Sequence, residues 1–138
     1  MANTYKYISV CLLLLSIGSC KTEKAPEYEW KTMEVIATAY NSLAYQTDSN
    51  PHITAFGDSL IPGRNYIAVS NDLRRLGLDH DTPVKIEGFD SVYLVKDKMH
   101  PRWRKHIDIY MGTDVNAARK WGRQKVQIEY RVPIETED

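Results

Sequence analysis

Short runs that mix β-branched, aromatic and polar residues recur along the chain after residue 32, and this pattern is typical of β-strands. In residues 106–111 the alternation is strict: Ile107, Ile109 and Met111 fall on one face, and Asp108 lies on the other. Gly88-Phe-Asp90 separates two such runs and predicts a hairpin turn. The pattern predicts strands over residues 33–40, 66–70, 83–88, 91–97, 106–111 and 125–130.

The segments between the predicted strands contain few regular elements. Residues 41–65 indicate a long irregular loop, and residues 71–77 indicate a turn or helix fragment. One short helix is expected near the C-terminus, beginning after Thr113 or Asp114 as the cap and ending at Trp121 before Gly122. Six strands with one late helix predict a mainly β fold, a small and mostly antiparallel barrel whose closure removes exposed edges.

The first residues have the organisation of an export signal. Lys6 precedes an apolar run over residues 8–17, which is shorter than the ~20 residues that span a bilayer, and Ile17-Gly-Ser-Cys20 follows. This order resembles the lipobox of bacterial lipoproteins, which implies cleavage before Cys20 and lipidation of its sulfur. A plain secretory signal cut nearby, or an uncleaved anchor, remains an alternative.

These features predict three parts of the chain. Residues 1–19 form the signal peptide, residues 20–32 a charged tether, and residues 33–132 the barrel domain. The acyl chains on Cys20 would then hold the protein to a membrane of the bacterial cell envelope, facing the periplasm or in the outer membrane.

Composition narrows the function further. The chain of 138 residues fits one domain, and its 18 basic and 18 acidic residues give no net charge. Nucleic-acid binding is not expected, because such proteins usually carry a basic surplus. Removal of the signal would also remove Cys11, leaving Cys20 as the one cysteine, so a disulfide and a thiol nucleophile are both excluded.

Seven short motifs occur in an order that resembles a known family. They are Ala37-Thr-Ala-Tyr40, Ile67-Ala-Val69, Leu76-Gly77, Val84-Lys-Ile-Glu-Gly88, Val95-Lys-Asp97, Ile107-Asp-Ile109 and Lys120-Trp-Gly122. From about Ile36 to Tyr130 the chain resembles the three-aspartate (3D) domain, a relative of the catalytic domain of membrane-bound lytic transglycosylase A and of rare lipoprotein A. The resemblance implies a six-stranded double-psi β-barrel that cleaves peptidoglycan glycan strands and leaves a 1,6-anhydro sugar.

The same resemblance assigns the catalytic residues. The second and third family aspartates match Asp97 and Asp108, and the general acid of the lytic transglycosylases matches Asp108. The first aspartate falls on Ser70, and Asp72, two residues on, is a candidate substitute. The glycine pair after the second aspartate is replaced by Lys98-Met-His100. The resemblance thus implies Asp108 as acid and base, with Asp97 in support and Asp72 and Ser70 as possible supporting residues.

The chemistry of Asp108 is consistent with this assignment. A carboxyl that is half-desolvated beside another carboxylate has a raised pKa, which suits a general acid near neutral pH. No nucleophilic carboxylate is needed, because the C6 hydroxyl of the sugar can close on C1. The alternatives are that Asp108 faces solvent or pairs with a basic residue of the following set: Arg102, Arg104 and Lys105.

Other polar residues provide candidates for binding. The resemblance places the loop after the first strand beside the glycan groove, and the candidates there are Tyr40, Thr47, Asp48, His52 and Thr54, although ordinary loop polarity also explains them. His100 and His106 lie near the aspartates, but their spacing matches no familiar ligand signature, so neither a metal nor a cofactor is expected. A non-catalytic peptidoglycan-binding barrel and a protein-binding adaptor remain alternatives to the enzyme.

Overall fold

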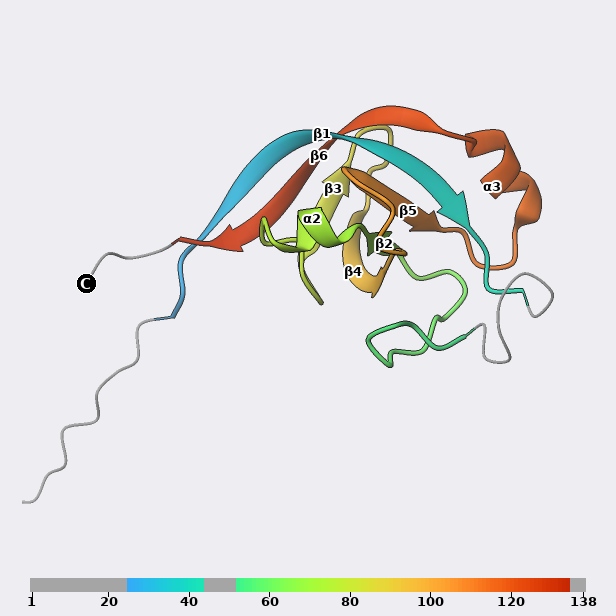
Figure 1. The fold of residues 1–138 in the computed structure, drawn as a ribbon, viewed down its shortest axis with the longest axis horizontal. Coiled ribbons are helices and arrows are strands. Elements are labelled where there is room, and N and C mark those ends of the chain that lie inside the picture. The colour runs from blue at the N-terminus through green and yellow to red at the C-terminus, as the bar shows by residue number, and fades with distance from the viewer. Residues whose placement is uncertain (1–24, 44–51, 135–138) are drawn as a thin grey trace, which may run out of the picture.

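The computed structural model describes residues 25–43 and 52–134 (Figure 1). In chain order its elements are β1 (Tyr28–Tyr40), β2 (Tyr66–Val69), α2 (Asn71–Arg74), β3 (Pro83–Ile86), β4 (Val92–Lys98), β5 (His106–Tyr110), α3 (Val115–Trp121) and β6 (Gln124–Pro133). The prediction of a mainly β fold is confirmed.

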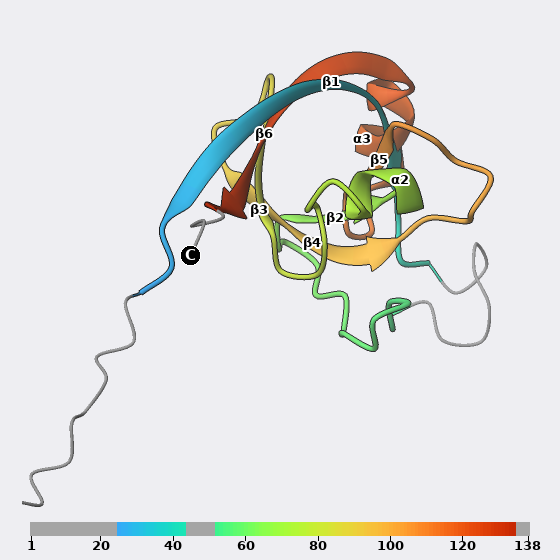
Figure 2. The same ribbon diagram turned by 60° about the vertical axis from the view of Figure 1, so that its left-hand side comes forward.

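The strands close into a barrel in the order β1-β5-β2-β4-β3-β6. Two neighbouring pairs, β1 with β5 and β2 with β4, are parallel, and the other pairs are antiparallel. In Figure 2, β1 and β6 arch over one side of the ring and β4 lies on the opposite side. This closed, mixed, six-stranded arrangement confirms the predicted double-psi β-barrel.

The barrel interior is filled by alternate residues of the strands. On β6, Val126, Ile128, Tyr130 and Val132 are buried while their neighbours are exposed. The other strands contribute mainly β-branched residues to the same core: Val35, Ile67, Val69, Val84, Val95, Ile107 and Ile109. The period-2 pattern of the sequence therefore identified the inward faces correctly.

The first strand begins earlier than predicted. Residues 28–32 were expected to belong to the tether, but they pair with the end of β6, from Tyr28 opposite Pro133 to Thr32 opposite Glu129. Aromatic and charged residues alternate in this segment, but its side chains are all exposed and none of them joins the barrel core. The strand β1 therefore begins at Tyr28, within the residues predicted as the tether, and β6 ends at Pro133.

The connecting elements agree with their local sequence signals. Asp114 caps α3 by accepting a hydrogen bond of 2.9 Å from the Ala117 N–H, and Gly122 ends the helix with a φ of 65°. Of the long loop, the described part holds one isolated bridge, between Ile53 and Ser59.

The predicted signal peptide and Cys20 lie outside the described residues. In residues 25–43 and 52–134, no helix is long and apolar enough to cross a membrane.

Candidate functional site

Both predicted catalytic aspartates lie in one row that crosses four adjacent strands. Asp108 on β5 is the register partner of Thr38 on β1 and of Ala68 on β2, and Ala68 is also the partner of Asp97 on β4. Residues in register on neighbouring strands share a face. The Cα atoms of the two aspartates are therefore about 10 Å apart, two strand spacings, with a small residue between them.

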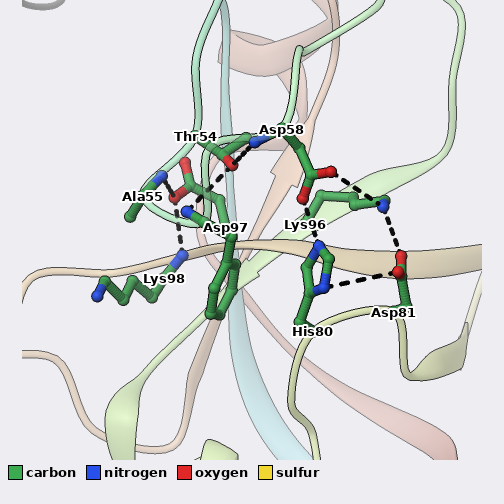
Figure 3. Close-up of polar contacts among 9 residues, drawn as sticks. Thr54, Ala55, Asp58, His80, Asp81, Lys96, Asp97 and Lys98 are labelled. Carbon is green, nitrogen blue, oxygen red and sulfur yellow. Dashed lines mark hydrogen bonds and ion pairs between the residues drawn. The ribbon is translucent and has the colours of Figure 1, made fainter.

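A register shift brings Asp97 into this row. Along β2 and β4 the pairing passes from Ile67 with Val95 to Ala68 with Asp97, so Lys96 is skipped. Lys96 instead forms ion pairs with Asp58, at 3.4 Å, and with Asp81. Figure 3 shows these neighbouring side chains of β4 in different directions: Lys96 points to Asp58 and Asp81, and Asp97 points to the backbone N–H of Ala55.

The row lies outside the barrel core, at a small pocket of about 150 Å³. Asp97 and Asp108 both line this pocket, which we call the acid pocket, and Ala68 lies in its wall between them. Its other walls come from β1, the end of β4 and the segment that follows, through Tyr40, Lys98, Met99, His100 and Trp103. The two carboxyls therefore open onto one site.

Asp108 has the electrostatic character of a general acid. Burial raises its pKa from 3.8 to about 6; the Asp97 charge adds to the rise, and a hydrogen bond from Thr38 opposes it. The Thr38 hydroxyl donates to Asp108 Oδ1 at 2.9 Å. A carboxyl with this pKa is partly protonated near neutral pH, so it can both donate and accept a proton.

A buried histidine completes a hydrogen-bond chain behind Asp108. His106 Nε2 lies 2.9 Å from Thr38 Oγ1; when Asp108 is ionised and accepts the single Thr38 proton, Nε2 is the donor to Thr38. The His106 side chain is 1% exposed and its ring packs against Trp103 at 4.6 Å between centroids. Burial, with the Arg123 charge, lowers the pKa of His106 and keeps the ring neutral.

The sequence analysis did not single out Thr38, and it considered His106 only as a metal ligand rather than as a hydrogen-bond partner of Thr38. The available signal was positional, since Thr38 lies two residues before Tyr40 and His106 two residues before Asp108. Each therefore shares the face of a predicted site residue.

Asp97 is held by backbone donors rather than by a cation. Its Oδ1 accepts hydrogen bonds of 2.8 Å from the N–H groups of Ala55 and Lys98. Burial raises its pKa, and these two hydrogen bonds act in the opposite direction. Among the described residues, neither Asp97 nor Asp108 forms an ion pair, so the alternative in which a basic residue neutralises Asp108 does not apply.

Tyr40 provides a hydroxyl at the same pocket. Its oxygen is buried and has no hydrogen-bond partner among the described residues. Burial raises the pKa of Tyr40 well above its ordinary value, and the charges of Asp97 and Asp108 add to this effect. The phenol therefore remains protonated and can donate a hydrogen bond to a ligand in the pocket.

The other predicted binding residues are placed differently. Thr54 is buried and its hydroxyl accepts hydrogen bonds from the Phe56 and Asp58 N–H groups, which shapes the loop that reaches Asp97. The side chain of His52 is exposed. Thr47 and Asp48 lie outside the described residues.

Ser70 and Asp72 lie behind the pocket rather than in its walls. Ser70 is fully buried and its Oγ accepts a hydrogen bond from the His106 N–H at 3.1 Å. Asp72 accepts a hydrogen bond of 2.9 Å from the Lys105 N–H. Burial acts to raise the pKa of Asp72, but the hydrogen bonds from Ser70 and Lys105 outweigh it, and the pKa is lowered overall. Both residues fix the start of β5, which carries Asp108.

The two candidate metal-ligating histidines are not brought together as a ligand set. His106 Nε2 contacts Thr38, and His100 Nδ1 accepts a hydrogen bond from the Arg102 N–H at 3.3 Å. In the part of the chain that the structure describes, no group of three or more His, Cys, Asp or Glu side chains is arranged to hold a metal ion.

These observations define the class of the molecule: a double-psi β-barrel with two carboxyls and a tyrosine at one pocket outside its core. No protein-family model matches the sequence, and no curated protein matches it.

The comparison with solved structures found the following matches among others. The Streptomyces papain inhibitor has a TM-score of 0.51 at 16% identity, and the match covers 72% of this chain and 94% of the inhibitor. An apo expansin of Clavibacter michiganensis has a TM-score of 0.45, and an Asp-to-Asn mutant of a Clavibacter michiganensis expansin in complex with cellohexaose has one of 0.40. Both are 20% identical over 78% of this chain, which spans about half (52%) of each expansin. The likeness to the papain inhibitor concerns the fold.

Proposed function

We propose that this protein is a lipid-anchored enzyme of the bacterial cell envelope that cleaves the glycan strands of peptidoglycan, with Asp108 as the acid and base. The observation that carries the proposal is that Asp108, with its pKa of about 6, and Asp97 line one pocket, and that neither forms an ion pair among the described residues. The anchor would be Cys20, and peptidoglycan and the membrane would be the partners.

In this mechanism Asp108 acts twice. Its protonated carboxyl donates to the glycosidic oxygen as the bond from C1 to that oxygen breaks, which releases the leaving sugar as an alcohol. The C6 hydroxyl of the remaining sugar then bonds to C1 and loses its proton to the Asp108 carboxylate. Atoms and charge balance without water, and the product is a 1,6-anhydro sugar.

The neighbouring residues have supporting roles in the same scheme. The Asp97 carboxylate would stabilise the positive charge that develops at C1, and its own charge helps to keep the pKa of Asp108 high. Thr38 and His106 hold the Asp108 carboxyl in one orientation, and the Tyr40 hydroxyl offers a donor to the sugar.

The test is incubation of the mature chain with purified sacculi, with separation of the soluble products by mass spectrometry. We expect anhydro-muropeptides from the wild type and none from Asp108→Asn. The control is Asp114→Asn, which removes an exposed carboxylate at a helix cap where Asn serves equally well. Full activity of Asp108→Asn would refute the assignment.

Two other outcomes would identify the alternatives. Binding to sacculi without soluble products would indicate a non-catalytic peptidoglycan-binding barrel. If the protein neither binds sacculi nor releases soluble products, the protein-binding adaptor is the alternative that is left.

A further inference from the structure

The acid pocket is one of three hollows that are joined by shared residues. Lys98 lines both the acid pocket and a second hollow of about 460 Å³, which we call the cationic pocket. Arg75 lines both the cationic pocket and a third hollow of about 540 Å³ beside the last residues of β6, lined in part by Leu76, Val132 and Ile134. A ligand longer than one sugar can therefore extend from the acid pocket over α2.

The cationic pocket carries an excess of positive charge. Its walls are formed by Asn71, Arg74, Arg75, Asp79 and Lys98. Arg74 is neutralised, because its Nη2 lies 2.9 Å from Asp79 Oδ1 and its Nε donates to the same oxygen. The two remaining cations, Arg75 and Lys98, form no ion pair among the described residues.

The arrangement of these two cations favours an external anion. Lys98 follows Asp97 directly, but Figure 3 shows its ammonium group extending away from that carboxylate. The nearest ring contact of its Nζ is with Phe56, at 5.9 Å from the centroid. The Arg75 side chain is exposed at the end of α2. Arginine and lysine that face a hollow without an internal partner are suited to bind carboxylates.

We propose that the cationic pocket binds a carboxylate of the ligand whose sugar occupies the acid pocket, through Arg75 and Lys98. This inference rests on the proposed function and narrows its substrate class to glycans that carry carboxylates, as the peptide-bearing sugars of peptidoglycan do. A neutral glycan such as chitin would have no carboxylate for Arg75 and Lys98 to bind, so the cationic pocket would add nothing to its affinity.

The experiment compares two probes and two matched double variants of the mature chain. The probes are a muropeptide tetrasaccharide with free peptide carboxylates and the neutral chitin tetrasaccharide. Arg75→Gln/Lys98→Gln removes the two cations, and Arg119→Gln/Lys120→Gln removes one arginine and one lysine that are exposed at the end of α3. Affinities are measured by calorimetry at low and high salt, in the Asp108→Asn background so that the probes are not cut.

We expect Arg75→Gln/Lys98→Gln to bind the muropeptide about tenfold more weakly than the parent, because two exposed charge contacts are lost and each contributes part of this factor. Its affinity for the chitin tetrasaccharide should equal that of the parent. High salt should bring the parent protein towards the affinity of this variant. The α3 variant should bind both probes like the parent.

Each contrary result has a distinct meaning. Equal muropeptide affinity of the parent and Arg75→Gln/Lys98→Gln overturns the carboxylate site. If the wild type still releases anhydro-muropeptides from sacculi, the proposed function survives that result. Absence of both sacculus cleavage and probe binding overturns the proposed function and the carboxylate site together.

Discussion

Replacement of Asp108 by Asn should stabilise the fold at neutral pH and have little effect at pH 4. Burial raises the pKa of Asp108 from 3.8 to about 6 in the folded protein, so the folded state binds the proton more tightly than the unfolded chain. Stability that is present below pH 4 is therefore lost as the pH rises to about 6. Since a tenfold change in proton affinity is worth about 1.4 kcal/mol, the loss is about 3 kcal/mol.

The asparagine side chain in the Asp108→Asn variant would carry no charge and keep an oxygen that can accept the Thr38 hydrogen bond. Urea unfolding of both proteins at intervals from pH 4 to pH 8 gives the free energy of unfolding at each pH. The advantage of Asp108→Asn should be near zero at pH 4 and approach about 3 kcal/mol at pH 8. Asp114→Asn, at the exposed cap of α3, controls for the removal of one carboxylate. A stability difference that does not change with pH, or a variant that is less stable at pH 8, would refute the buried, unpaired state of Asp108.

Three further predictions concern Thr38, Gly77 and Ala68. Thr38→Val removes the hydrogen bond that lowers the pKa of Asp108, so that pKa should rise above about 6 in carboxyl-carbon NMR titrations, and Thr38→Ser should restore it. Gly77→Ala should destabilise the fold by about 2 kcal/mol or more in thermal unfolding, because φ is 104° and the added methyl would lie 2.7 Å from Val132 Cγ1. Ala68→Val should cost at most about 3 kcal/mol in stability but fill the wall between the two carboxyls, so sacculus cleavage should be lost from a folded protein.

The strands were predictable from their β-branched and aromatic residues, and β5 and β6 also from a one-sided apolar pattern. The inward residues of β5 and β6 alternate with polar ones over several positions, and the hairpin between β3 and β4 has Gly88 at a φ of 87°. The start of β1 was not predicted: aromatic and charged residues alternate over residues 28–32, but all of them are exposed, and the segment is a strand through its pairing with the end of β6. Pairing across the barrel is a long-range property that local periodicity does not record.

The site was predictable in part for the same reason. The family resemblance singled out Asp97 and Asp108, and the structure brings both to one pocket, but the interval of eleven residues between them says nothing of Ala68, which aligns with both. That alignment depends on the register shift in β4, and no residue pattern in residues 92–98 marks it. Thr38 and His106 were missed because a hydroxyl and an imidazole beneath a carboxyl become visible only when β1 and β5 are known to be parallel neighbours.

The energetics of the acid pocket argue that it is a functional site rather than a structural one. A half-buried carboxyl in a structural role normally has a cation beside it, as Asp58 has Lys96. Asp108 has no such cation: burial, and to a smaller extent the Asp97 charge, destabilise its charged form and raise its pKa, and the hydrogen bond from Thr38 only partly opposes them. An asparagine in its place would keep the hydrogen bond and avoid that cost. A residue that lowers stability where a neutral isostere would not is best explained by chemistry that needs its proton.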